Sequence, residues 1–168
     1  MRVLTSIKNI IDSVIKWFSI GILGIMTILV IYQVFARQIL GSPSVITEAA
    51  SQNMFVWLVI LGGSYMFGLR EHLDVTVLKD KYSPFVLMVM EIIIHVVLLG
   101  FATTVMIRGG WIYSSNQMGT VDAALQIPLG LIRSVIPISG FIITFYSVYN
   151  CILAINEFKV EKNVKEVS

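Results

Sequence analysis

The chain alternates between long apolar stretches and short charged ones. Four of the apolar stretches contain few or no charged residues, and each is long enough for the helix of about 20 residues that crosses the hydrocarbon core of a bilayer. Helices are expected because lipid offers no hydrogen-bond partner to an unpaired backbone. The pattern therefore predicts an all-α integral membrane protein with four transmembrane helices, at about residues 17–36, 49–69, 85–107 and 134–156.

The first sixteen residues carry a hydrophobic pattern of their own. Apolar residues recur there at three- and four-residue spacing, with charged residues between them. This spacing is typical of an amphipathic helix, and we interpret residues 1–16 as a helix on the cytoplasmic face of the membrane. The alternative is an extension of the first span that packs against another helix. Residues 17–156 then form the membrane domain, and residues 157–168 form a charged cytoplasmic tail.

Lysines and arginines are unevenly distributed among the segments that flank the spans. The N-terminal segment, the loop after the second span and the C-terminal tail hold three each, whereas the two remaining segments hold Arg37 alone and the pair Arg108 and Arg133. Positive residues near span ends favour the cytoplasmic side. We therefore expect both termini and the central loop to face the cytoplasm.

Composition supports a membrane protein and excludes several other classes. Hydrophobic residues make up 57% of the chain and charged residues 13%, whereas about a quarter of a soluble domain is charged. The net charge of +2 is too small to indicate binding of nucleic acid. A single cysteine, Cys151, excludes an intramolecular disulfide, a C-x-x-C redox pair and a cysteine-based zinc site.

Glu91 and His95 are ionisable residues inside a predicted span. Their spacing places them on one helix face, with His95 near the middle of the membrane. Such residues are candidates for a proton relay or coupling site. The alternative, which we favour, is that they form hydrogen bonds across a helix interface, because the spans hold no second acidic residue.

No arrangement of residues predicts a cofactor, a metal site or catalysis. The second histidine, His72, lies in a loop, so it cannot join His95 in ligating a haem. The chain has neither a glycine-rich phosphate loop nor a G-x-S-x-G elbow. We therefore expect a protein that is not an enzyme.

Small residues and one tryptophan indicate how the helices pack. Ser64 with Gly68, and Gly140 with Thr144, have the spacing that permits close helix approach. We interpret these pairs as contacts within the chain. Trp57 lies too deep in its span to anchor at the interface, which suggests packing instead.

Two stretches of the chain resemble the small membrane subunit, of the DctQ type, of tripartite ATP-independent periplasmic (TRAP) transporters. They are "SPSVITEAASQNMFVWLVILGGSYMFGLREHLDVTVL" and "QIPLGLIRSVIPISG". In that family an acidic residue precedes the second span, an F-x-W-x-x-x-L-G core fills the span, and a histidine follows it. The matching residues here are Glu48, then Phe55, Trp57, Leu61 and Gly62, then Glu71, His72 and Asp74.

The resemblance implies a small accessory subunit that braces a larger one in the bacterial inner membrane. Its implied partners are a large multi-spanning TRAP membrane subunit and a periplasmic substrate-binding protein, besides the lipid bilayer. The implied transporter is secondary and sodium-coupled, and it imports an organic carboxylate. Glu48 and His72 would fix the two ends of the second span, by contacts either with partner groups or with lipid headgroups.

Two other functions stay open from the residues alone. One is an independent, homo-oligomeric small channel or transporter that uses Glu91 and His95, and the other is a membrane anchor for an enzyme complex. The residues that we select as partner contacts or structural contacts are Glu48, Phe55, Trp57, Gly62, His72, Asp74, Glu91 and His95.

Overall fold

The structure is a computed structural model that describes residues 2–39, 41–42, 44–69 and 83–167. Its helices are α1 (Arg2–Gln38), α2 (Val45–Leu69), α4 (Pro84–Phe101), the π-helix η1 (Ala102–Gly109), α5 (Gly110–Asn116), α6 (Leu129–Arg133) and α7 (Val135–Val167). Four helical stretches are long and apolar enough to cross a membrane. This confirms the prediction of four membrane-spanning helices.

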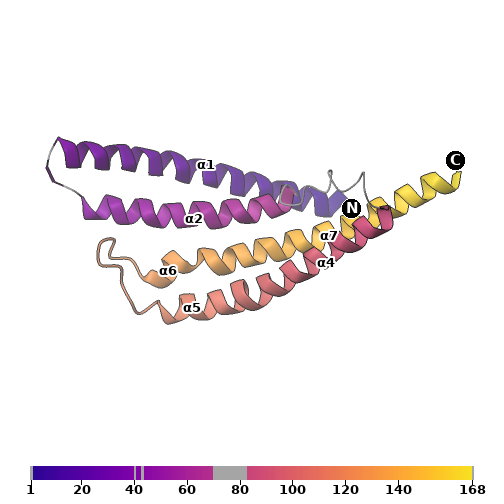
Figure 1. Ribbon diagram of the computed structural model, residues 1–168. Helices are drawn as coiled ribbons and strands as arrows, with labels where there is room; N and C mark the ends of the chain where they lie inside the picture. Colours follow the sequence, from indigo (N-terminus) through magenta and orange to yellow (C-terminus); the bar gives the residue numbers. More distant parts are fainter. Residues whose placement is uncertain (1, 40, 43, 70–82, 168) are drawn as a thin grey trace.

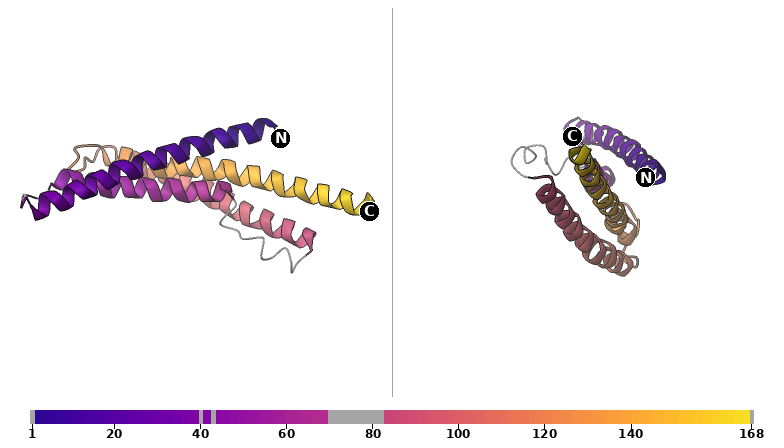
Figure 2. Two further views of the ribbon diagram at one scale, coloured as in Figure 1. Left: turned by 90° about the horizontal axis from the view of Figure 1, so that it is seen from above. Right: turned by 90° about the vertical axis from the view of Figure 1, so that its right-hand side faces the viewer.

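The four long helices form an open layer (Figures 1 and 2). α1 packs on α2, α2 packs on α7, and α7 packs on α4 and its continuation η1. Within the described part of the chain, the two outer helices α1 and α4 share no comparable interface. The row therefore does not close into a bundle, and α2 and α7 occupy its centre.

The described connections between the long helices fall at one end of this layer. The chain termini lie at one end, and the turn between α1 and α2 lies at the other, together with the segment that joins α5 to α6 (Figure 1). We call these the terminal end and the turn end of the layer. The arrangement agrees with the predicted topology, in which both termini share one side of the membrane. That this side is the cytoplasm stays a prediction.

The helices extend beyond the predicted spans. α1 runs without a break through residue 16, and α7 continues through most of the predicted tail. Backbone hydrogen bonding carries a helix past the end of its apolar run, so apolar length alone underestimates helix length. The location of residues 1–16 on the membrane surface stays a prediction, because helix continuity does not test it.

The third span contains a π-helix that the apolar pattern did not predict. In η1 the hydroxyl of Thr104 donates to the carbonyl of Gly100 at 2.6 Å, and that of Thr103 donates to Leu99 at 2.8 Å and to Gly100 at 3.2 Å. Threonine hydroxyls that compete for helix carbonyls loosen the regular hydrogen-bond pattern, and an inserted residue produces a π-helical turn. The helix then continues as α5 to Asn116.

The core follows the seam between α1, α2 and α7. Ile15, Leu61, Val135 and Tyr146 are its buried members. Much of the remaining apolar surface is exposed, including Ile10 and Val14 of α1. Lipid is as apolar as these side chains, so their exposure is compatible with a membrane and not with water.

Candidate functional site

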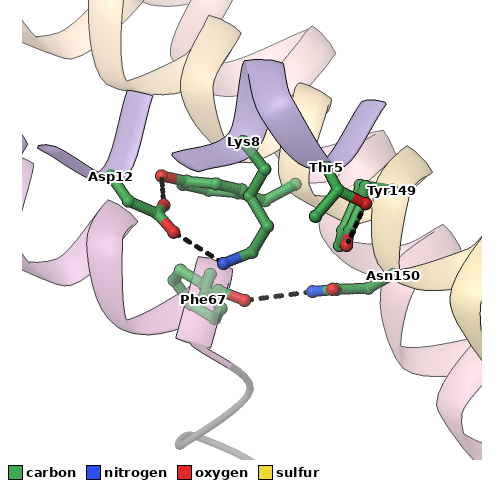
Figure 3. A network of polar contacts seen from close by, with 7 residues as sticks. Thr5, Lys8, Asp12, Phe67, Tyr149 and Asn150 are labelled. Carbon is green, nitrogen blue, oxygen red and sulfur yellow. Dashed lines mark hydrogen bonds and ion pairs between the residues drawn. The ribbon is translucent and has the colours of Figure 1, made fainter. Parts of the chain in front are cut away.

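A polar network joins three helices near the terminal end of the layer (Figure 3). Lys8 and Asp12, one turn apart on α1, form an ion pair with 2.6 Å between Nζ and Oδ2. The other oxygen of Asp12 accepts a hydrogen bond of 2.5 Å from the hydroxyl of Tyr146 on α7. The Lys8 ammonium also lies 5.9 Å from the centroid of the Tyr146 ring, within the range of a cation–π contact. Lys8 and Asp12 therefore both face α7.

Two further contacts extend this network. Asn150 of α7 donates from Nδ2 to the carbonyl of Phe67 at 3.1 Å, and Phe67 lies two residues before the end of α2. The last carbonyls of a helix lack partners within the helix, so Asn150 satisfies one of them. The hydroxyls of Thr5 and Tyr149 lie 3.5 Å apart between α1 and α7. The network therefore holds the N-terminal part of α1 and the end of α2 against α7.

Partial burial strengthens the ion pair of this network. The Tyr146 side chain is fully buried, and those of Lys8 and Asp12 are each 16% exposed. Ion pairs exposed to water contribute little because of screening, whereas breaking a buried pair leaves an uncompensated charge. We therefore expect the Lys8–Asp12–Tyr146 contacts to contribute more to the free energy of unfolding than an ion pair on a water-exposed surface does.

The packing of α4 on α7 gives the level of His95 along the layer. The rings of Phe85 on α4 and Phe158 on α7 pack edge to face, 5.9 Å apart. α4 and α7 are antiparallel, and His95 follows Phe85 by ten residues. It therefore lies level with the residues of α7 about ten positions before Phe158, near Asn150. Because Asn150 contacts Phe67, near the end of α2, His95 lies at the level where α2 ends. The depth of His95 in the membrane stays a prediction.

The burial of His95 agrees with a role in packing. Its side chain is 3% exposed, on a helix that packs along α7. Glu91 precedes it by one turn and lies farther toward the terminal end. The geometry places His95 at the interface of α4 with α7, whereas Glu91 is only partly buried. Whether either one has a functional role stays a prediction.

Trp57 ties α2 to two other helices. Its Nε1 donates to the carbonyl of Ile132 in α6 at 2.8 Å, and its ring lies 6.2 Å from that of Phe18 in α1. The carbonyl of Ile132 belongs to the last turn of a short helix, where such groups need outside partners. In the structure Trp57 therefore packs between α1, α2 and α6.

We expect the substitution Trp57→Phe to lower the free energy of unfolding by about 0.5–1.5 kcal/mol, the usual contribution of one hydrogen bond. The aromatic ring is kept, so the contact with Phe18 should persist. Thermal unfolding of the detergent-purified chain measures the loss. Trp111→Phe is the matched control, because Trp111 is exposed, and an equal loss in both variants would contradict the role of the Ile132 bond.

The small residues singled out from the sequence serve packing within the chain. A Cβ atom on Gly68 would lie 2.6 Å from the Tyr146 ring, and one on Gly140 would lie 2.8 Å from Ile107. Gly68 therefore permits the approach of α2 to α7, and Gly140 permits that of α7 to η1. A Cβ atom on Gly62 would meet nothing within 4 Å, and the Phe55 side chain is exposed.

A second polar cluster lies at the turn end. The amide of Gln33 donates both to the carbonyl of Thr47 and to the hydroxyl of Ser51, each at 2.7 Å. These bonds fasten the end of α1 to the first turns of α2. Arg37 and Glu48 line a pocket beside them. Sequence reasoning missed Gln33, although a lone amide inside an apolar span was a usable signal.

The other selected residues give no site of their own. His72 and Asp74 lie outside the described residues. Among the described residues, no group of three or more histidine, cysteine, aspartate or glutamate side chains is placed to hold a metal ion. In the described part of the chain, the polar contacts of Gln33, Trp57, Tyr146 and Asn150 join helices to one another.

Comparison with known proteins identifies similar sequences over most of the chain. Residues 26–157 match the family described as "Tripartite ATP-independent periplasmic transporters, DctQ component". The chain is also 30% identical, over 139 residues, to a protein of Haemophilus influenzae (strain ATCC 51907 / DSM 11121 / KW20 / Rd) described as a TRAP transporter small permease protein. That match covers 83% of this chain and 86% of the relative.

Proposed function

Because the chain belongs to the DctQ family, and is thus a small permease subunit of a TRAP transporter in the inner membrane, we propose that it acts as a scaffold for a larger membrane subunit. Membership of the family implies that it works with other TRAP components. The proposal concerns what this chain contributes to them. It would hold a large multi-spanning subunit in place while that subunit carries the substrate.

The open layer of helices is the observation that carries this proposal. α1 and α4 do not close on one another, and large apolar side chains are exposed along all four long helices. A layer of this kind offers a long, rigid and apolar surface to another membrane protein. Polar side chains hold its own helices together, as in the Lys8–Asp12–Tyr146 contacts. This use of polar groups is expected of a scaffold more than of a channel.

The finer parts of the function rest on resemblance to the family. We propose that the transporter takes its substrate from a periplasmic binding protein, that it is driven by sodium ions, and that the substrate is an organic carboxylate. Uptake of labelled carboxylates into cells or proteoliposomes, with and without sodium and the binding protein, tests these three statements separately.

Affinity purification of the tagged chain from its native membrane in mild detergent tests the scaffold role. A large multi-spanning protein should be recovered in stoichiometric amount and identified by mass spectrometry. Phe55→Ala should lower that recovery, because Phe55 is exposed on α2. Phe101→Ala, which truncates an exposed ring on α4, shows whether the face of α4 contributes to the same contact. Recovery of this chain alone, as a defined oligomer, would contradict the proposal.

The substitution His95→Gln separates the scaffold role from the rival function, an independent channel that uses Glu91 and His95. The rival predicts that this substitution abolishes transport. We expect transport per assembled complex to be unchanged, because His95 is buried at a helix interface within the chain. The amount of folded complex is measured in parallel, since a buried substitution can lower it. Loss of transport by a fully assembled complex would favour the rival.

A further inference from the structure

A small polar pocket lies at the turn end of the layer, between the end of α1 and the start of α2. It is lined by Gln33, Val34, Arg37, Ser44 and Glu48 and has a volume of about 120 Å³. One water molecule needs only about 10–15 Å³, so the pocket can hold a group of several heavy atoms. The bonds of Gln33 to Thr47 and Ser51 fix the two helices that form its walls.

The pocket carries one cation and one anion. Arg37 and Glu48 both line it, and within the described part of the chain neither side chain forms an ion pair or a hydrogen bond. Arginine presents a planar fork of donors that matches phosphate. A glutamate carboxylate accepts hydrogen bonds from an ammonium group. The pocket is therefore complementary to a group that carries both charges.

The surroundings of the pocket are those of a membrane interface. Phe35 and Ile39 on α1, and Val45 and Ile46 on α2, are exposed large hydrophobic residues. They lie where two stretches able to cross the membrane end and begin, at Gln38 and Val45. A charged pocket bordered by exposed apolar side chains suits a molecule with a polar head and apolar tails.

We propose that this pocket binds the headgroup of a zwitterionic phospholipid that carries a primary amine. The Arg37 guanidinium donates hydrogen bonds to the phosphate, and the Glu48 carboxylate accepts them from the ammonium group. A headgroup with a phosphate and no amine leaves Glu48 without a partner. A quaternary ammonium headgroup has the positive charge and lacks the N–H donors.

The test uses the full chain purified together with its co-purifying subunits and stripped of loosely bound lipid. Phosphatidylethanolamine, phosphatidylglycerol and phosphatidylcholine are added separately in mixed micelles. Native mass spectrometry counts the retained lipid, and thermal unfolding measures stabilisation by each. Phosphatidylethanolamine should be retained best and should raise the unfolding midpoint most.

Substitutions of the two charged residues test which part of the headgroup each one contacts. Arg37→Gln should weaken retention of phosphatidylethanolamine and phosphatidylglycerol alike by about tenfold, the effect of losing one charge-assisted hydrogen bond. Glu48→Gln should remove the preference for phosphatidylethanolamine over phosphatidylglycerol. Arg108→Gln is the matched control, because Arg108 is an exposed cation outside the pocket, and it should change neither quantity.

Three results would overturn the proposal. Equal retention of the three lipids, unaffected by either pocket variant, would mean that lipid surrounds the chain without a specific site. Equal stabilisation by soluble phosphoethanolamine would assign the pocket to a small solute. Loss of a co-purifying subunit in Arg37→Gln and Glu48→Gln, with lipid retention unchanged, would assign it to a protein contact.

Discussion

Replacing Gly68 by valine is expected to lower the free energy of unfolding by about 1–3 kcal/mol, the usual cost of overpacking a tight contact. A Cβ atom at this position would lie 2.6–2.8 Å from three carbons of the Tyr146 ring. The ring cannot easily move aside, because it is fully buried and its hydroxyl is bonded to Asp12. α2 would have to separate from α7. Thermal unfolding in detergent, with the monodisperse fraction from size-exclusion chromatography, measures the effect.

Gly62→Val is the matched control for this prediction. Gly62 lies on the same helix, six residues earlier, and a Cβ atom there would meet nothing within 4 Å. The two variants introduce the same side chain into α2, so their helix propensities cancel. Equal destabilisation would show that the Tyr146 contact is not the cause. If Gly62→Val instead keeps the chain stable and weakens recovery of the larger subunit, Gly62 contacts that subunit.

The sequence predicted the spans well and their arrangement poorly. Four apolar stretches of sufficient length, bounded by residues such as Lys16 and Arg37, are enough to locate membrane helices. The order of the helices in the layer cannot be predicted from apolar length, because positions that face lipid and positions that face another helix can be equally apolar. The π-helix was missed for a related reason, since Thr103 and Thr104 are only a local signal inside a long apolar run.

Some of the polar contacts could be predicted from the sequence, and others could not. Trp57 was recognised as a packing residue because it lies too deep for the interface. The ion pair of Lys8 and Asp12 is visible as a one-turn spacing, but the sequence does not show which helix the two residues face. The structure has them facing α7, with Ile10 exposed. The partner Tyr146 lies 134 residues away in the sequence, so local spacing cannot reveal it.

Replacing Asp12 by alanine is expected to lower the free energy of unfolding by about 2–3 kcal/mol. Breaking a fully buried ion pair costs about 3–5 kcal/mol, and the 16% exposure of both charged side chains places this pair below that range. The loss has two causes: Lys8 keeps a partly buried charge without its anion, and the buried hydroxyl of Tyr146 loses its acceptor. Lys16→Ala, which removes an exposed charge one turn farther along α1, should change stability little.

A double-mutant cycle separates the bond between Asp12 and Tyr146 from general packing. Tyr146→Phe alone should cost about 1 kcal/mol, because it removes one hydrogen bond and keeps the ring. The double variant should lose less than the sum of the single losses, since both substitutions remove the same bond. Purely additive losses would mean that the two residues act independently, and that apolar contacts such as those of Ile15 hold α1 to the layer. A coupled loss would make Asp12 the residue that fastens the N-terminal part of α1 to α7.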